Sequence, residues 1–115
     1  MLTRSDILLI EAQLKQFGCT PRAADIYMHC LKIGPASVQE ISRGLKQNRV
    51  TIHSAVEQLI DKGLVYETRK RKKRLIVAEK PAVLYSILQR KENDLQSLRH
   101  NLGYVTELLA SIQST

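Results

Sequence analysis

Residues 37–63, SVQEISRGLKQNRVTIHSAVEQLIDKG, decide the fold of this chain. Ser37 and Glu40 stand three residues apart, which is the spacing of a capping box, so we expect a short helix to begin here. Apolar side chains then recur on one face of this helix, at Val38, Ile41 and Leu45. The segment therefore opens with a short amphipathic helix.

A second helix is expected after a polar turn through Gln47. Asn48 is a favoured N-cap residue and Gly63 is a favoured stop, so this helix is predicted over Arg49 to Lys62. Its apolar residues follow helical spacing, at Ile52, Ala55, Val56 and Leu59. Two helices joined by a short turn predict a helix-turn-helix, whose second helix can enter the major groove of DNA.

The outer face of the second helix is small and polar. At about 100° per residue, Val50 and Ser54 lie nearly opposite the inward Ile52, and they are flanked by Thr51, His53, Glu57 and Gln58. The first turn of a helix also points unpaired N–H groups outward, where they can meet a phosphate. We therefore predict DNA contacts from Gln47, Asn48, Arg49, Val50, Thr51, His53 and Ser54.

Two further helices are expected before this motif. Thr3 and Asp6 can cap the first one, and Gly18 can end it. The pair Thr20–Pro21 predicts the start of the second, which should end at Gly34–Pro35. The first helix has an apolar stripe suited to packing against the last helix, formed by Ile7, Ile10, Leu14 and Phe17.

The apolar period changes after the helix-turn-helix. Leu64–Thr68 and Leu75–Glu79 are rich in Val, Ile and Tyr, which predicts the two strands of a hairpin. An unbroken basic run separates them: Arg69, Lys70, Arg71, Lys72, Lys73 and Arg74. We expect these six residues to form the tip of a wing that contacts the DNA backbone beside the second helix.

The basic run carries most of the net charge. The chain has 18 Lys and Arg against 11 Asp and Glu, a formal charge of +7, and removing the six charges of the run leaves +1. A charge concentrated in this way indicates a local contact with a polyanion. Taken alone, the run could also be a nuclear localisation signal.

A long terminal helix is expected from Pro81. Its apolar positions repeat in a 4-3-4-3 series with one polar member, Lys91, and they are Leu84, Leu88, Leu95, Leu98, Leu102, Val105, Leu109 and Ile112. This heptad pattern predicts a coiled coil that joins two chains. The alternative is packing of this helix against the first helix of its own chain.

Other functional classes lack their sequence signals. With 115 residues the chain has room for one globular domain with appended helices, and no apolar stretch approaches a membrane span. A signal-peptide pattern is absent from the start. There is no Gly-rich phosphate loop, no G-x-S-x-G elbow and no H-E-x-x-H, so we expect neither an enzyme nor a cofactor.

Metal binding and thiol chemistry are not expected either. His29, His53 and His100 belong to three different predicted helices and have no second ligand at metal spacing. Cys19 and Cys30 lack a nearby pair of histidines, so we interpret them as buried free thiols.

Five stretches of the chain resemble one known family. They are 14–20 (LKQFGCT), 24–27 (ADIY), 31–37 (LKIGPAS), 40–41 (EI) and 56–65 (VEQLIDKGLV), and they look like the N-terminal DNA-binding domain of TrmB-type winged-helix transcriptional regulators. The resemblance covers about residues 10–112. It implies a dimeric regulator of the bacterial or archaeal cytoplasm, in which the fourth helix binds DNA and the terminal helix pairs the protomers. Longer members carry a C-terminal sugar-binding domain that this sequence does not have, so no small-molecule effector is expected by that route.

The predicted fold is mainly α with a small β-hairpin: a winged helix-turn-helix with an N-terminal helix and a long C-terminal coiled-coil helix. We expect residues 1–19 to support the dimer, 20–80 to bind DNA and 81–115 to dimerise. The predicted function is that of a dimeric, DNA-binding transcriptional regulator. A winged-helix protein-interaction module, which would dock a partner through its coiled coil and basic loop, is the alternative, and double-stranded RNA is a minor alternative ligand.

Overall fold

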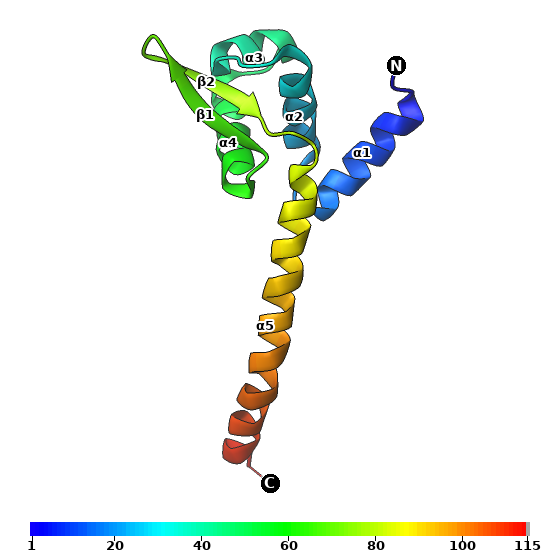
Figure 1. The fold of residues 1–115 in the computed structure, drawn as a ribbon, viewed down its shortest axis with the longest axis vertical. Helices are drawn as coiled ribbons and strands as arrows, with labels where there is room; N and C mark the ends of the chain where they lie inside the picture. Colours follow the sequence, from blue (N-terminus) through cyan, green and yellow to red (C-terminus); the bar gives the residue numbers. More distant parts are fainter. Residues whose placement is uncertain (115) are drawn as a thin grey trace. The chain divides into compact units, whose positions relative to one another are not determined.

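A computed structural model describes residues 1–114 as five helices and one antiparallel hairpin (Figure 1). Their bounds are α1 (Arg4–Gln16), α2 (Pro21–Ile33), α3 (Val38–Leu45), α4 (Arg49–Lys62), β1 (Val65–Lys70), β2 (Lys73–Ala78) and α5 (Val83–Ile112). This confirms the predicted fold class. The chain divides into two compact units, Met1–Pro81 and Ala82–Thr115, and the final residue Thr115 lies outside the described residues.

Helices α1 to α4 begin where the sequence predicts caps. The hydroxyl of Thr3 accepts a hydrogen bond from the backbone N–H of Asp6 at 3.1 Å, and Ser37 and Glu40 form the second capping box. The side chain of Asn48 accepts from the N–H of Val50 at 2.7 Å at the start of α4. These bonds satisfy donors that a helix cannot satisfy internally, so local sequence chemistry determines the helix starts.

One apolar core holds α2, α3, α4 and the hairpin together. Its largest fully buried side chains include Ile26 of α2, Ile41 of α3, Ile52 and Leu59 of α4, and Ile76 of β2. Burial of such a side chain contributes about 1.5–3 kcal/mol. Because Ile52 and Leu59 point into this core, the opposite face of α4 is exposed to solvent.

The basic run is organised differently from the prediction. We expected six residues in the tip, but β1 and β2 pair as far as Arg69 with Arg74 and Lys70 with Lys73. Only Arg71 and Lys72 form the turn, with φ of 53° and 67°. A two-residue turn with positive φ at both positions matches the right-handed twist of the strands, so pairing continues to the turn itself.

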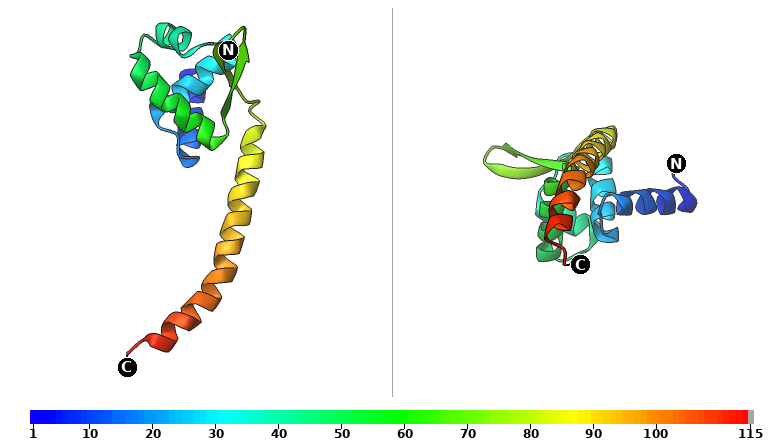
Figure 2. Two further views of the ribbon diagram at one scale, coloured as in Figure 1. Left: turned by 90° about the vertical axis from the view of Figure 1, so that its left-hand side faces the viewer. Right: turned by 90° about the horizontal axis from the view of Figure 1, so that it is seen from below.

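A short bridge that the sequence did not predict anchors the hairpin. Ala36, between α2 and α3, exchanges two backbone hydrogen bonds with Ile76 of β2, with N···O distances of 3.1 and 2.7 Å. This bridge fixes the inner end of β2 against the helices, while the turn projects away from them (Figure 2).

The terminal helix α5 starts two residues later than expected, at Val83, and none of its 30 residues is buried. Its apolar heptad residues include Leu95 and Leu98, which are 65% and 60% exposed. The apolar heptad residues of α5 therefore form a stripe that is not buried. Among residues 1–114, no helix combines the length and the apolar character needed to cross a membrane.

Candidate nucleic-acid interface

The predicted contact residues of α4 gather on its exposed side. Val50 is 77% exposed, and His53 and Ser54 are exposed beside it, whereas Ile52 is fully buried. Gln47 and Arg49 are exposed where α4 begins. The orientation inferred from helical periodicity is therefore correct, and α4 presents a small polar surface with one apolar residue near its start.

The turn before α4 is held by its own hydrogen bonds. The hydroxyl of Ser42 donates to the carbonyl of Gln47, and Lys46 takes a left-handed conformation with φ of 54°. Asn48 uses its side-chain oxygen to cap α4, which leaves only its NH₂ group to donate to a ligand. Asn48 is thus primarily the residue that fixes where α4 starts.

Arg74 forms ion pairs with two carboxylates of its own chain. Its Nη2 lies 2.6 Å from Oε1 of Glu57 on α4, its Nε lies 2.5 Å from Oε2 of Glu67 on β1, and its side chain is only 26% exposed. The hydrogen bonds to Glu57 and then Glu67 raise the pKa of Arg74 above its ordinary value. This residue ties the hairpin to α4.

Lys73 forms a second ion pair between the hairpin and the helices, with Glu40 of α3. Its Nζ lies 3.0 Å from Oε1 of Glu40, and both side chains are about half exposed. The hydrogen bond from Lys73, followed by those from Ser37, lowers the pKa of the Glu40 carboxyl. Two of the six cations of the basic run are therefore paired with carboxylates of the same chain.

The other four cations of the run are Arg69, Lys70, Arg71 and Lys72, which we call the tip cations. All four are exposed, and within residues 1–114 none of them forms an ion pair. Arg71 and Lys72 form the turn that projects from the helices, and Arg69 and Lys70 are the last two residues of β1 before it. The unpaired charge of the basic run is therefore concentrated at the end of the hairpin.

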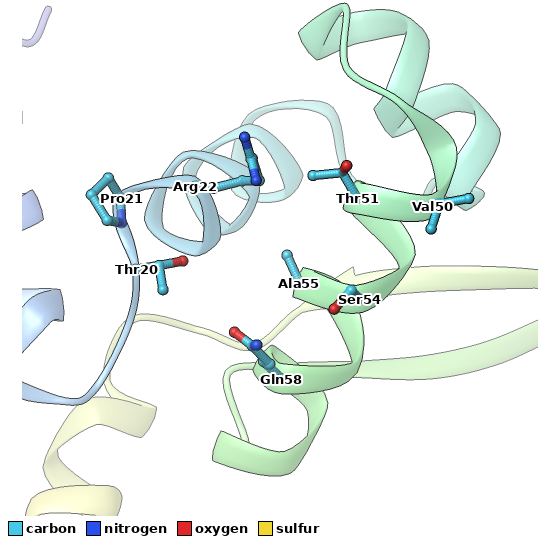
Figure 3. A pocket seen from close by; sticks show the side chains of 8 residues that line it. All are labelled: Thr20, Pro21, Arg22, Val50, Thr51, Ser54, Ala55 and Gln58. Carbon is cyan, nitrogen blue, oxygen red and sulfur yellow. The ribbon is translucent and has the colours of Figure 1, made fainter.

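A groove that the sequence did not reveal runs along the other edge of the α4 surface. We call it the α2–α4 groove, and it is lined by Thr20, Pro21, Arg22, Val50, Thr51, Ser54, Ala55 and Gln58 (Figure 3). The cap signal correctly placed Thr20 and Pro21 at the start of α2. No local signal could place that start beside α4, because their proximity depends on the packing of the whole unit.

The two cysteines do not have the lowered pKa of a reactive thiol. Burial raises the pKa of Cys30 to about 11 and also raises that of Cys19, so both thiols stay protonated at neutral pH. Both cysteines are free and buried, which confirms their interpretation. In the described part of the chain, no three His, Cys, Asp or Glu side chains are grouped to hold a metal ion.

Comparison with known families places most of the chain in a described family. Residues 14–90 match the family described as "Sugar-specific transcriptional regulator TrmB". No curated protein matches the chain.

Several solved structures are similar in fold. A protein from the thermoacidophilic archaeon Sulfolobus tokodaii is 19% identical with a TM-score of 0.57, over 87% of this chain and 97% of that one. A transcriptional regulator from Thermotoga maritima is 22% identical with a TM-score of 0.57, over 95% and 90%. TrmBL2, an archaeal chromatin protein, is 17% identical with a TM-score of 0.69, over 95% of this chain and 44% of that one.

Proposed function

The chain belongs to the TrmB family of transcriptional regulators, which are not enzymes, and from this premise we propose that it binds double-stranded DNA as a homodimer. The observation that carries the proposal is the exposed polar face of α4 beside four unpaired tip cations. This combination offers both a surface that fits a groove and charge for the backbone.

In the proposed complex α4 lies in the major groove, which is about 12 Å wide and admits one helix. Thr51, His53 and Ser54 supply hydrogen-bonding groups, and the exposed Val50 can contact a thymine methyl group. Gln47 and Arg49 reach the bases or phosphates near the start of α4. Because most of these side chains are short, base discrimination should be modest.

The tip cations contact phosphates in this complex. Such contacts hold the protein on the duplex and fix its orientation, but they carry no sequence information. Lys73 and Arg74 act differently from our expectation for the whole run, since they fix the hairpin against α3 and α4 through Glu40 and Glu57. The wing then binds DNA with a preset angle to α4.

The partner of α5 in this proposal is α5 of a second copy. Its 30 residues span about 45 Å, and burying the heptad residues removes the exposed apolar stripe from water. A dimer presents two copies of α4, which suits a two-fold operator with half-sites about 34 Å apart. The dimer would act in the cytoplasm of a bacterium or archaeon, and the proposal includes no small-molecule effector.

Selection of bound duplexes from a random pool tests this function. We expect enrichment of a palindromic site, and substitution of Ser54 by Ala should lower the preference for that site more than the affinity for random duplex. A protein that binds no duplex even at low salt would contradict the proposal and favour the protein-interaction module.

A further inference from the structure

The α2–α4 groove borders the face of α4 on the side away from the hairpin. Going round α4 at about 100° per residue, His53 and Glu57 form one edge of the exposed face, Val50 and Ser54 its centre, and Thr51 and Gln58 the other edge. Glu57 binds Arg74 of the hairpin, whereas Thr51 and Gln58 line the groove. The two edges therefore meet different elements.

The groove carries one positive charge, which comes from Arg22. Arg22 is the single ionic residue among its eight lining residues, and Figure 3 shows its side chain extending toward Thr51. Arg22 is exposed, and across residues 1–114 it forms no ion pair, in contrast to Arg74 with its two carboxylates. Its guanidinium keeps all its donors for a ligand, and a planar guanidinium suits phosphate oxygens.

Neutral donors line the same groove. The hydroxyl of Thr20 accepts a hydrogen bond from the N–H of Ala23 at 3.1 Å, so its own proton remains free to donate. The hydroxyls of Thr51 and Ser54 and the amide of Gln58 add further donors along α4. A DNA backbone that leaves the α4 surface on this side would meet one cation and several neutral donors.

We propose that the α2–α4 groove binds a phosphodiester of the DNA backbone through Arg22, on the edge of α4 opposite the wing. This inference rests on the proposed DNA binding by α4. The groove and the wing then hold α4 from both sides, one contacting each strand that borders the major groove. Such a contact carries no sequence information, so it adds affinity equally to every site.

The test compares two single substitutions on the same helix. Arg22→Gln removes the groove cation, and Lys32→Gln removes an exposed cation at the other end of α2. Each full-length variant is titrated with a random duplex by fluorescence anisotropy over a range of salt concentrations. The slope of log K against log salt is negative, and we expect Arg22→Gln to reduce its magnitude by about 0.9 for each chain bound. Lys32→Gln should leave the slope unchanged.

Gln58→Glu provides a second, independent variant, because it puts a carboxylate into the groove without removing Arg22. It should weaken binding to random duplex and leave thermal stability unchanged. Phosphate ethylation interference should identify at least one phosphate whose ethylation weakens binding of the wild-type protein. Ethylation of the same phosphate should not weaken binding of Arg22→Gln. This phosphate should differ from those that become insensitive to ethylation when the tip cations are neutralised.

The possible failures are distinguishable. If the wild-type protein binds no duplex, the proposed function fails and this inference fails with it. If the wild type binds but Arg22→Gln behaves like Lys32→Gln, this inference alone is overturned. Saturable binding of inorganic phosphate in the groove at constant ionic strength, with no change in the DNA salt slope, would assign the groove to a small anion and overturn it as well.

Discussion

The unit Met1–Pro81 and the helix α5 differ in how they bury apolar side chains. Helices α2, α3 and α4 and the hairpin share one core in which Ile26, Ile41 and Ile52 are fully buried. In α5 no residue is buried, although its heptad positions are apolar apart from Lys91. Because most helical stability comes from packing an apolar face, we infer that α5 needs a partner that the unit Met1–Pro81 does not need.

The largest effect should come from disrupting the row of apolar heptad residues of α5, which we call the α5 seam. Leu95→Glu with Leu102→Glu places charges at two exposed positions of this seam, which should leave the protein folded but monomeric by sedimentation equilibrium. Loss of the linked second DNA-binding unit should lower operator affinity by roughly 10²- to 10⁴-fold.

Ser97→Glu with Tyr104→Glu is the matched control, since it adds the same charge two residues further along, outside the seam. We expect this control to stay dimeric with full affinity. A dimeric seam variant would refute the assignment of α5 as the dimerisation helix.

Truncating the core should lower stability strongly but leave the proposed pairing of α5 intact. Ile52→Ala removes a fully buried side chain of α4 and should lower the free energy of unfolding by about 2–5 kcal/mol in urea titrations. Val50→Ala, two residues away on the exposed face, should change it by less than about 0.5 kcal/mol. Similar losses for both variants would show that α4 is oriented differently.

The hairpin turn should respond in opposite directions for stability and for binding. Arg71 and Lys72 both have positive φ, a conformation that favours Asn and Gly. Replacing them by Asn and Gly should raise the stability of the unit by about 0.5–1 kcal/mol in thermal unfolding. The same variant should bind duplex DNA more weakly, because two tip cations are gone.

The smallest effect concerns the pair between Lys73 and Glu40. The pKa of Glu40 is lowered in the folded protein, so its stabilisation is present above the pKa of the unfolded chain and is lost as pH falls through the folded value. Thermal melts of wild type and Glu40→Gln should therefore differ slightly at neutral pH and converge in acid. A difference that grows in acid would contradict this sign.

Local sequence patterns predicted the parts of the fold that depend on local chemistry. Thr3, Ser37 and Asn48 cap helices because a side chain satisfies a neighbouring N–H group, and this requires no tertiary information. The inward direction of Ile52 followed from helical period alone. The exposed face of α4 was predicted for the same reason.

The errors concern contacts between distant residues. A basic run resembles a loop in composition, but cross-strand pairing extends to Lys70 and Lys73, and the position of the turn depends on that register. The carboxylate partners of Arg74 lie 17 and 7 residues away along the chain, at Glu57 and Glu67. The position of Arg22 beside α4 likewise depends on how α2 packs, which no local pattern encodes.

The salt dependence of DNA binding tests the central claim most directly. Arg71→Gln with Lys72→Gln removes two unpaired tip cations, and Lys15→Gln with Lys32→Gln removes two exposed cations elsewhere in the same unit. A dimer of the tip variant lacks four phosphate contacts, so on random duplex the magnitude of its negative slope of log K against log salt should fall by about 3.6, at about 0.9 per contact. The control should keep the wild-type slope. Equal slopes for the two variants would contradict the assignment of the wing to the DNA backbone.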